Sequence, residues 1–163
     1  PHGTSRRQRQ MCIRDSSTYI DAHLALIHTR LSFFDLSDAG NQPFWDDSGR
    51  YVLLYNGEVY NFRELRVELE RRGVKFRTKS DTEVVLYALV HDGTHALEKF
   101  QGMFALALID TEEKKVLLAR DRFGIKPAYF ITHNNQFYFS SEVNAFKPWI
   151  NLKPDMTLSL IHI

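Results

Sequence analysis

The chain has 163 residues, of which 44% are hydrophobic and 25% are charged, and its formal net charge is +1. This length suits one domain with a substantial core, and the composition is typical of soluble globular proteins. The basic residues are dispersed, which argues against binding to nucleic acid or to an anionic membrane, and no apolar run approaches the roughly 20 residues of a membrane-spanning helix.

The two ends of the chain differ from its centre. Residues 1–20 show no hydrophobic periodicity, and residues 158–163 show no helix or strand pattern. Both ends resemble translated sequencing-adapter reads, and the alternative is a pair of ordinary disordered termini. We therefore expect a non-native or disordered leader over residues 1–20, one domain over residues 21–157, and a tail of the same kind as the leader over residues 158–163.

The first half of the domain alternates strands and helices. Residues 23–34 are a predicted strand with a polar interruption, residues 35–43 a loop rich in turn formers, and residues 51–55 a buried strand that ends at Asn56-Gly57. Asn61 and Glu64 have the spacing of a capping box, which predicts a helix that ends at Gly73. Residues 74–77 then form a predicted short strand.

The second half adds an apolar helix and two hairpins. Ser80 and Glu83 form a second predicted capping box before the helix 84–90, and residues 95–100 form a short helix. The runs 103–109 and 115–119 are predicted to pair around the turn 110–114, and 128–131 to pair with 136–139. Because strands precede, separate and follow the helices, the pattern predicts an α+β fold with largely antiparallel sheets.

Several kinds of site lack support in the sequence. Cys12 is the only cysteine, which excludes an internal disulfide framework and fits a reducing compartment, so we expect a cytoplasmic protein. His91 and His95 have i, i+4 spacing, but Gly93 interrupts them and no cysteine or acidic cluster completes a metal site. The chain also has no glycine-rich phosphate-binding pattern. We therefore expect no metal and no nucleotide cofactor in this chain.

Polar residues beside the predicted strands and helices are candidates for a binding site. Arg30 is flanked by apolar residues and its planar guanidinium suits a carboxylate. Asn56 and Gly57 offer a side-chain amide and an unhindered N–H, a pair that can bind an oxyanion. Asp81, with Glu58, could bind an ammonium group. Together these residues have the groups needed to hold a free α-amino acid.

Each of these residues also has a purely structural explanation. Asp81 at a helix start is favourable to the helix dipole whatever it binds, and Glu58 could pair with a basic neighbour. Asn56-Gly57 is a common hairpin turn, and Arg30 could form a structural ion pair. The spacing alone does not decide between the two explanations.

Five sequence blocks carry a family resemblance. They are residues 28–44 (HTRLSFFDLSDAGNQPF), 55–61 (YNGEVYN), 80–83 (SDTE), 101–104 (QGMF) and 120–127 (RDRFGIKP). Over about residues 22–148 the chain resembles the N-terminal glutaminase domain of glutamine-hydrolysing asparagine synthetases, which are class II glutamine amidotransferases. The amidophosphoribosyltransferases and glucosamine-6-phosphate synthases match less well at residues 58–61 and 120–127.

The resemblance implies a fold and a role for each candidate residue. The implied fold is the N-terminal-nucleophile hydrolase αββα sandwich of antiparallel sheets, here lacking its first strands. Arg30 is implied to bind the glutamine carboxylate, Asp81 with Glu58 to hold the α-amino group, and Asn56 with Gly57 to form the oxyanion hole. The block at residues 120–127 is expected to serve the fold and domain contacts, without a catalytic role.

The chain departs from the family at the nucleophile. The family uses an N-terminal cysteine whose own free α-amine acts as the base, and it begins Met-Cys-Gly-Ile. Met11-Cys12-Ile13 resembles this start, but the glycine is absent, ten residues precede Met11, and only seventeen separate Cys12 from Arg30. We therefore reject Cys12 as the nucleophile and expect this chain alone to be inactive.

The resemblance also implies partners. Glutamine is the expected ligand, and the expected partner is a C-terminal synthetase domain, missing here, that would bind ATP and magnesium and use the released ammonia to convert aspartate to asparagine. A homodimeric parent is compatible with the resemblance. Two other readings remain open: a non-catalytic module that kept the glutamine pocket, and the glutaminase domain of a sugar-modifying or peptide-cyclising amidotransferase.

Overall fold

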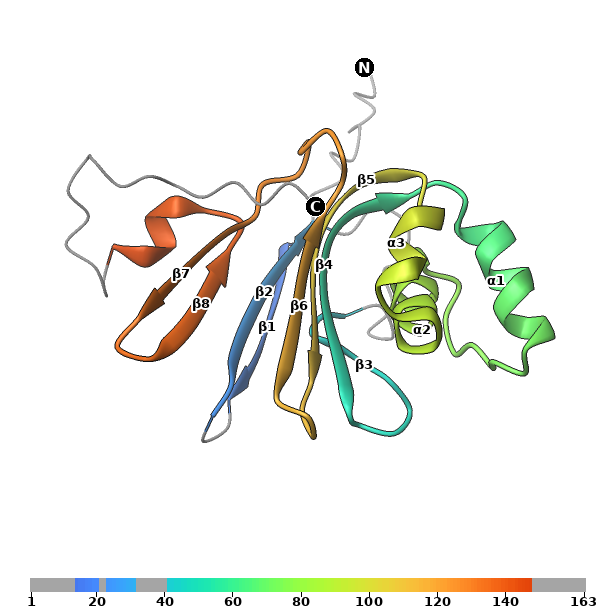
Figure 1. The fold of residues 1–163 in the computed structure, drawn as a ribbon, viewed down its shortest axis with the longest axis horizontal. Coiled ribbons are helices and arrows are strands. Elements are labelled where there is room, and N and C mark those ends of the chain that lie inside the picture. Colours follow the sequence, from blue (N-terminus) through green and yellow to red (C-terminus); the bar gives the residue numbers. More distant parts are fainter. Residues whose placement is uncertain (1–13, 21–22, 32–40, 148–163) are drawn as a thin grey trace, which may run out of the picture.

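The computed structural model describes residues 14–20, 23–31 and 41–147, and a four-stranded antiparallel sheet lies at its centre (Figure 1). The strand order is β3-β4-β5-β6, with β3 at Phe44–Trp45, β4 at Tyr51–Val59, β5 at Gly102–Asp110 and β6 at Lys115–Arg120. Two antiparallel hairpins accompany it: β1 (Arg14–Ile20) pairs with β2 (Ala25–Leu31), and β7 (Tyr129–His133) pairs with β8 (Gln136–Ser140).

Helices cover one face of the central sheet, and the β1–β2 hairpin packs on the other (Figure 1). The helices are α1 (Phe62–Arg71), α2 (Asp81–Asp92) and α3 (Ala96–Lys99), with short 3₁₀ turns at Gly93–His95 and Val143–Phe146. Successive side chains of a strand point to opposite faces, so β4 places Leu53 in the core under the helices and Leu54 against Leu26 of the hairpin.

Helix α2 begins at Ser80, as predicted, and is buried from Thr82 to Leu89. The Ser80 hydroxyl accepts the Glu83 N–H at 3.5 Å, but the Glu83 carboxylate turns to the preceding segment. It accepts the N–H groups of Arg77 at 2.9 Å and Thr78 at 2.7 Å. Because Glu83 binds these backbone groups in place of a neighbouring strand, the predicted strand at residues 74–77 is wrong.

Helix α1 also begins and ends where predicted, but its capping box is wrong. The Asn61 side chain makes no cap hydrogen bond. Its Nδ2 donates to the Lys99 carbonyl and its Oδ1 accepts the Gln101 N–H, both at 3.0 Å. Asn61 therefore ties the start of α1 to the segment that enters β5.

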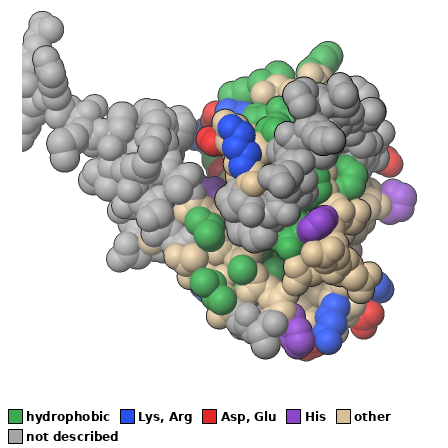
Figure 2. Space-filling model, turned by 90° about the vertical axis from the view of Figure 1, so that its left-hand side faces the viewer, with side chains coloured by type: hydrophobic (Ala, Val, Ile, Leu, Met, Phe, Trp, Pro, Cys, Tyr) green, Lys and Arg blue, Asp and Glu red, His purple; other side chains and the backbone are tan. Residues whose placement is uncertain are grey.

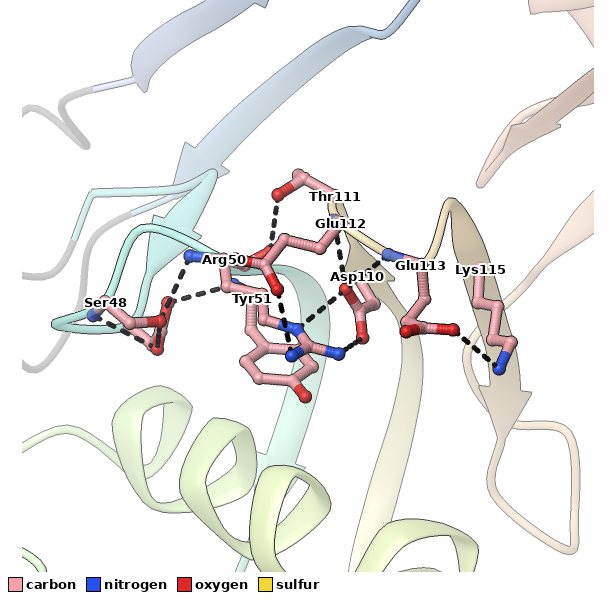
Figure 3. Close-up of polar contacts among 9 residues, drawn as sticks. Ser48, Arg50, Tyr51, Asp110, Thr111, Glu112, Glu113 and Lys115 are labelled. Atoms are coloured by element: carbon pink, nitrogen blue, oxygen red, sulfur yellow. Dashed lines mark hydrogen bonds and ion pairs between the residues drawn. The ribbon is translucent and has the colours of Figure 1, made fainter.

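The two predicted hairpins of the second half are confirmed. Asn134 and Asn135 form the β7–β8 turn with φ of 49° and 60°, the positive values that a type I′ turn requires. In the β5–β6 turn, Asp110 Oδ1 accepts the N–H groups of Glu112 and Glu113 (Figure 3). Arg50 at the start of β4 donates to the same carboxylate at 2.7 and 3.0 Å and, as the largest cause, lowers the pKa of Asp110 to about 2.

The N-terminal segment differs from the sequence-based expectation. We expected a non-native or disordered leader over residues 1–20, and Arg14–Ile20 is ordered as β1, where the Tyr19 ring contacts the Trp45 ring with centroids 4.9 Å apart. The β-branched and aromatic residues of this segment suit a strand, and their pairing with β2 was not visible locally. Residues 1–13 and 148–163 lie outside the described residues. Within the described part, no helix is long and apolar enough to cross a membrane.

Candidate functional site

Strand β4 extends beyond the predicted end at Asn56-Gly57 and runs to Val59. Asn56 pairs with Ala105 and Gly57 pairs with Phe104 of β5. The expectation that the strand stops at Asn-Gly is therefore wrong, because pairing with a distant strand overrides the local turn preference of these residues. The amide and the N–H of the candidate pair are consequently held on a rigid strand.

Gly57 occupies a position that other residues do not fit. Its φ is +148°, and a Cβ atom at this position would lie 2.1 Å from the carbonyl oxygen of Met103. Gly102, on the opposite strand, has the matching constraint, since its Cβ would lie 2.0 Å from the carbonyl oxygen of Glu58. The two glycines thus allow β4 and β5 to approach closely at the candidate site.

The outer edge of β4 shows which way the Gly57 N–H points. The Tyr55 N–H donates to Gln42 Oε1 at 2.6 Å, and Gln42 Nε2 returns a bond to the Tyr55 carbonyl at 2.8 Å. Two positions past Gly57, the Val59 N–H donates to Asp81 Oδ2 at 3.2 Å. Every second N–H of a strand points to the same side, so the Gly57 N–H lies on this edge between two side-chain caps.

The bonding of Phe104, the partner of Gly57, supports this direction. Phe104 donates its N–H to the Asp121 carboxylate at 3.2 Å and accepts the Asp121 N–H at 2.8 Å. Both backbone groups of Phe104 therefore point toward β6 and away from Gly57. The pair Gly57–Phe104 is a non-hydrogen-bonded pair of the ladder, which leaves the Gly57 N–H directed outward.

Asp81 reaches the same edge from the first turn of α2. Its Oδ2 accepts the Tyr55 hydroxyl at 2.8 Å in addition to the Val59 N–H. Burial is the largest cause that raises the pKa of Tyr55, and the Asp81 and Glu58 charges add to it, so the hydroxyl remains protonated and donates. The structure thus brings the Asp81 carboxylate into contact with Val59, which lies two positions after Gly57 in β4.

Asn56 projects from the opposite side of β4. Its side chain is exposed and borders a cavity of about 150 Å³ between the central sheet, β2 and the end of β8. The lining is mostly apolar, with polar groups from His28, Ser140 and Ser141. Figure 2, which views the molecule from the side of the β7–β8 hairpin, shows exposed hydrophobic side chains and histidines on this face. A ligand bound by both Asn56 and Asp81 would therefore lie across the β4 edge.

The remaining candidates are placed in part. Glu58 is half-buried in β4, opposite Met103, and acts on the Tyr55 hydroxyl through its charge. The backbone of Arg30 lies in β2 opposite Asp15, and its side chain is outside the described part of the structure. Cys12 is also outside the described residues. The structure therefore brings Asp81 to the β4 edge beside Gly57. Asn56 and Glu58 lie in the same strand without a hydrogen bond to Asp81, and the Arg30 side chain and Cys12 are outside the described part.

Sequence reasoning missed two contributors, Tyr55 and Gln42. Tyr55 was assigned to the core because it ends an apolar run, and nothing local showed that its hydroxyl reaches Asp81. Gln42 lies in a segment predicted as a loop. The only signal that distinguished it was its place in the first of the five family blocks, residues 28–44. Both act through contacts between residues at least 13 positions apart in the chain, which single-sequence patterns do not reveal.

The block at residues 120–127 folds around one buried carboxylate. Asp121 accepts the N–H groups of Phe104, Phe123, Ile125 and Lys126. Burial alone would raise the pKa of Asp121, and these backbone donors outweigh burial and lower it. The carboxylate thus shapes the loop, as expected for a residue that serves the fold.

Comparison with known proteins identifies the family. The chain matches the glutamine amidotransferase domain model over residues 6–162. It is 43% identical over 129 residues to asparagine synthetase [glutamine-hydrolyzing] 1 of Bacillus subtilis, covering 78% of this chain and 20% of that protein. It is 40% identical over 134 residues to asparagine synthetase B of Escherichia coli, covering 82% of this chain and 24% of that protein.

A solved structure supports the same assignment. Glutamine phosphoribosylpyrophosphate amidotransferase from B. subtilis, complexed with ADP and GMP, matches with a TM-score of 0.63 and 25% identity, over 76% of this chain and 28% of that one. This match confirms the predicted fold class. The chain spans about a fifth to a quarter of the length of the two asparagine synthetases. By sequence and by fold, the chain belongs to the glutamine amidotransferase domain family and is homologous to the corresponding domain of glutamine-hydrolysing asparagine synthetases.

Proposed function

We propose that this domain binds glutamine across the outer edge of β4 and stabilises the oxyanion formed when the side-chain amide is attacked. The observation that carries the proposal is the row of groups on that edge. Gln42 caps the backbone at Tyr55, Asp81 caps it at Val59, and the Gly57 N–H points outward between them. Asn56, the adjacent residue, adds a side-chain amide.

The chemistry follows from the donors and charges present. Asn56 Nδ2 and the Gly57 N–H supply two hydrogen-bond donors for the negative oxygen of a tetrahedral intermediate, and one such donor contributes about 10²- to 10³-fold in kcat. Asp81 Oδ1 has no hydrogen bond from a described residue, so this oxygen, with Glu58, would accept the ligand ammonium. Arg30 on β2 would bind the ligand carboxylate.

The identity of the nucleophile is a proposal separate from glutamine binding. We propose that Cys12 does not serve, because Met11 and Ile13 flank it and an internal cysteine has no free α-amine to act as its base. This chain would then bind glutamine without hydrolysing it.

In a longer parent the same site would supply ammonia in the cytoplasm to a synthetase domain that uses ATP and magnesium to convert aspartate to asparagine. The small fraction of each relative that the chain covers supports such a further domain.

Calorimetric titration of the chain with L-glutamine tests the binding proposal. We expect saturable binding of L-glutamine and a dissociation constant raised about 10- to 100-fold by Asp81→Asn, because the ammonium loses a charged partner worth roughly 1.5–3 kcal/mol. Asp92→Asn is the matched control, since Asp92 is a carboxylate at the other end of α2 that pairs with Arg72 and Lys99. Absence of binding at about 10 mM glutamine, which corresponds to less than about 3 kcal/mol of affinity, would refute the proposal.

A further inference from the structure

We infer that Tyr55 is a positioning residue that makes the site select ligands with an α-amino group, by fixing the orientation of the Asp81 carboxylate. This inference rests on the proposed function, because it concerns how the same site recognises glutamine. It adds a residue that the sequence patterns assigned to the core.

Tyr55 is held at both of its ends. Its backbone N–H and carbonyl are bonded to the Gln42 side chain at 2.6 and 2.8 Å, so its position on the β4 edge is fixed. Its ring is buried, with 4% of the residue exposed. Its hydroxyl ends 2.8 Å from Asp81 Oδ2. The side chain is therefore a rigid connection between the strand that carries the oxyanion donors and the helix that carries Asp81.

The bond from Tyr55 determines which Asp81 oxygen is available. Oδ2 accepts two donors from β4, the Tyr55 hydroxyl at 2.8 Å and the Val59 N–H at 3.2 Å. The χ2 torsion of Asp, about the Cβ–Cγ bond, rotates easily when nothing holds the carboxylate. Here such a rotation would break both hydrogen bonds to Oδ2, so the two donors fix the plane of the carboxylate. Oδ1 is then held in one direction as the acceptor for the ligand ammonium.

The hydroxyl of Tyr55 also suits this role electrostatically. Burial raises the pKa of Tyr55, and the charges of Asp81 and Glu58 raise it further. The hydroxyl therefore stays protonated throughout the physiological range. It therefore acts as a constant donor and takes no part in proton transfer. Loss of the hydroxyl leaves Asp81 with the longer Val59 bond alone, and the carboxylate can then rotate away from the direction that the ammonium requires.

The experiment compares two ligands that differ only in the α-amino group. L-glutamine and glutaramic acid, which carries the same amide and carboxylate without the amine, are titrated into the wild-type chain and into Tyr55→Phe. We expect the wild-type preference for glutamine to fall about 3- to 30-fold in Tyr55→Phe. Tyr51→Phe, which removes a hydroxyl from the other end of β4, should leave the preference unchanged.

Two further variants separate positioning from general damage. In the Asp81→Asn background, Tyr55→Phe should cause no additional loss of preference, because the inferred role passes through Asp81. Asp81→Glu keeps the charge but moves the carboxylate off the two β4 donors, and should lose a similar share of the preference. This variant tests the inference even if Tyr55→Phe unfolds.

The outcomes are distinguishable from those of the proposed function. If the wild-type chain binds neither ligand, the proposed function and this inference are both overturned. If the wild-type chain prefers glutamine, but Tyr55→Phe lowers both affinities equally or neither, only the inference is overturned. Full preference in Asp81→Glu would also overturn it, because charge without fixed orientation would then suffice.

Discussion

Replacement of Gly57 by alanine tests the close approach of β4 and β5 at the candidate site. The new Cβ would lie 2.1 Å from the Met103 carbonyl oxygen and 2.6 Å from the Phe104 Cα, so the strands must separate by about 1 Å to restore ordinary contacts. Separation weakens the ladder bonds on either side, at about 1 kcal/mol each. A φ of +148° lies outside the left-handed α region and adds about 1–3 kcal/mol for a residue with a side chain. We expect a total loss of about 3–5 kcal/mol in the free energy of unfolding.

Urea unfolding followed by circular dichroism measures this loss, and thermal melting should show a midpoint lowered by about 6–20 °C. Gly49→Ala is the matched control, because Gly49 also has a positive φ, +73°, but no atom lies within 4 Å of its added Cβ. Gly49→Ala should lose only the backbone penalty of the left-handed conformation, about 1–2 kcal/mol. If the two variants are equally stable, β4 and β5 do not approach closely at Gly57 and the reasoning about the β4 edge fails.

Further outcomes are expected at other sites. Asn56→Asp should weaken glutamine binding at least about tenfold, because a carboxylate would face the ligand oxygen, and Asn144→Asp, on an exposed 3₁₀ turn, should not. Asp121→Asn should lower the free energy of unfolding by about 2–4 kcal/mol in urea titrations, and an unchanged midpoint would contradict the role of this carboxylate. Because the folded-state pKa of Asp110 is lowered from 3.8 to about 2, its stabilising contribution should be complete above about pH 4 and lost as the pH falls toward 2; Asp110→Asn melting curves should lack that part of the pH dependence. A glutamine-like alkylating agent should leave Cys12 unlabelled by mass spectrometry, and stoichiometric labelling would restore it as the nucleophile.

The elements that could be predicted are those whose signals are local. The run that became β5 is apolar throughout, and the turn at Asn134-Asn135 carries the residues that a type I′ turn needs. Ser80 marks the start of α2 for a similar reason, since a cap acts within one turn. In each case the determining residues lie within a few positions of one another.

The errors arose where a distant group determined the structure. Asn61 was expected to cap its own helix, but Lys99 and Gln101 occupy its side chain. Residues 74–77 were expected as a strand, but Glu83 binds the backbone at their end. The same limit applies to the candidate site: the residue types were predicted from family blocks, whereas the contact between Asp81 and Tyr55 appeared only in the folded chain.

The side-chain caps on β4 also bear on how the protein avoids self-association. A bare strand edge invites a strand from another molecule to pair with it, because successive N–H and carbonyl groups are available. Here Gln42 imitates one residue of such a strand at Tyr55, and Asp81 blocks the position at Val59. The backbone N–H and carbonyl of Gly57 are left between them, and one residue offers too short a ladder for an incoming strand but suits a small ligand. The groups that frame the candidate ligand site would therefore also protect the chain from aggregation by strand addition.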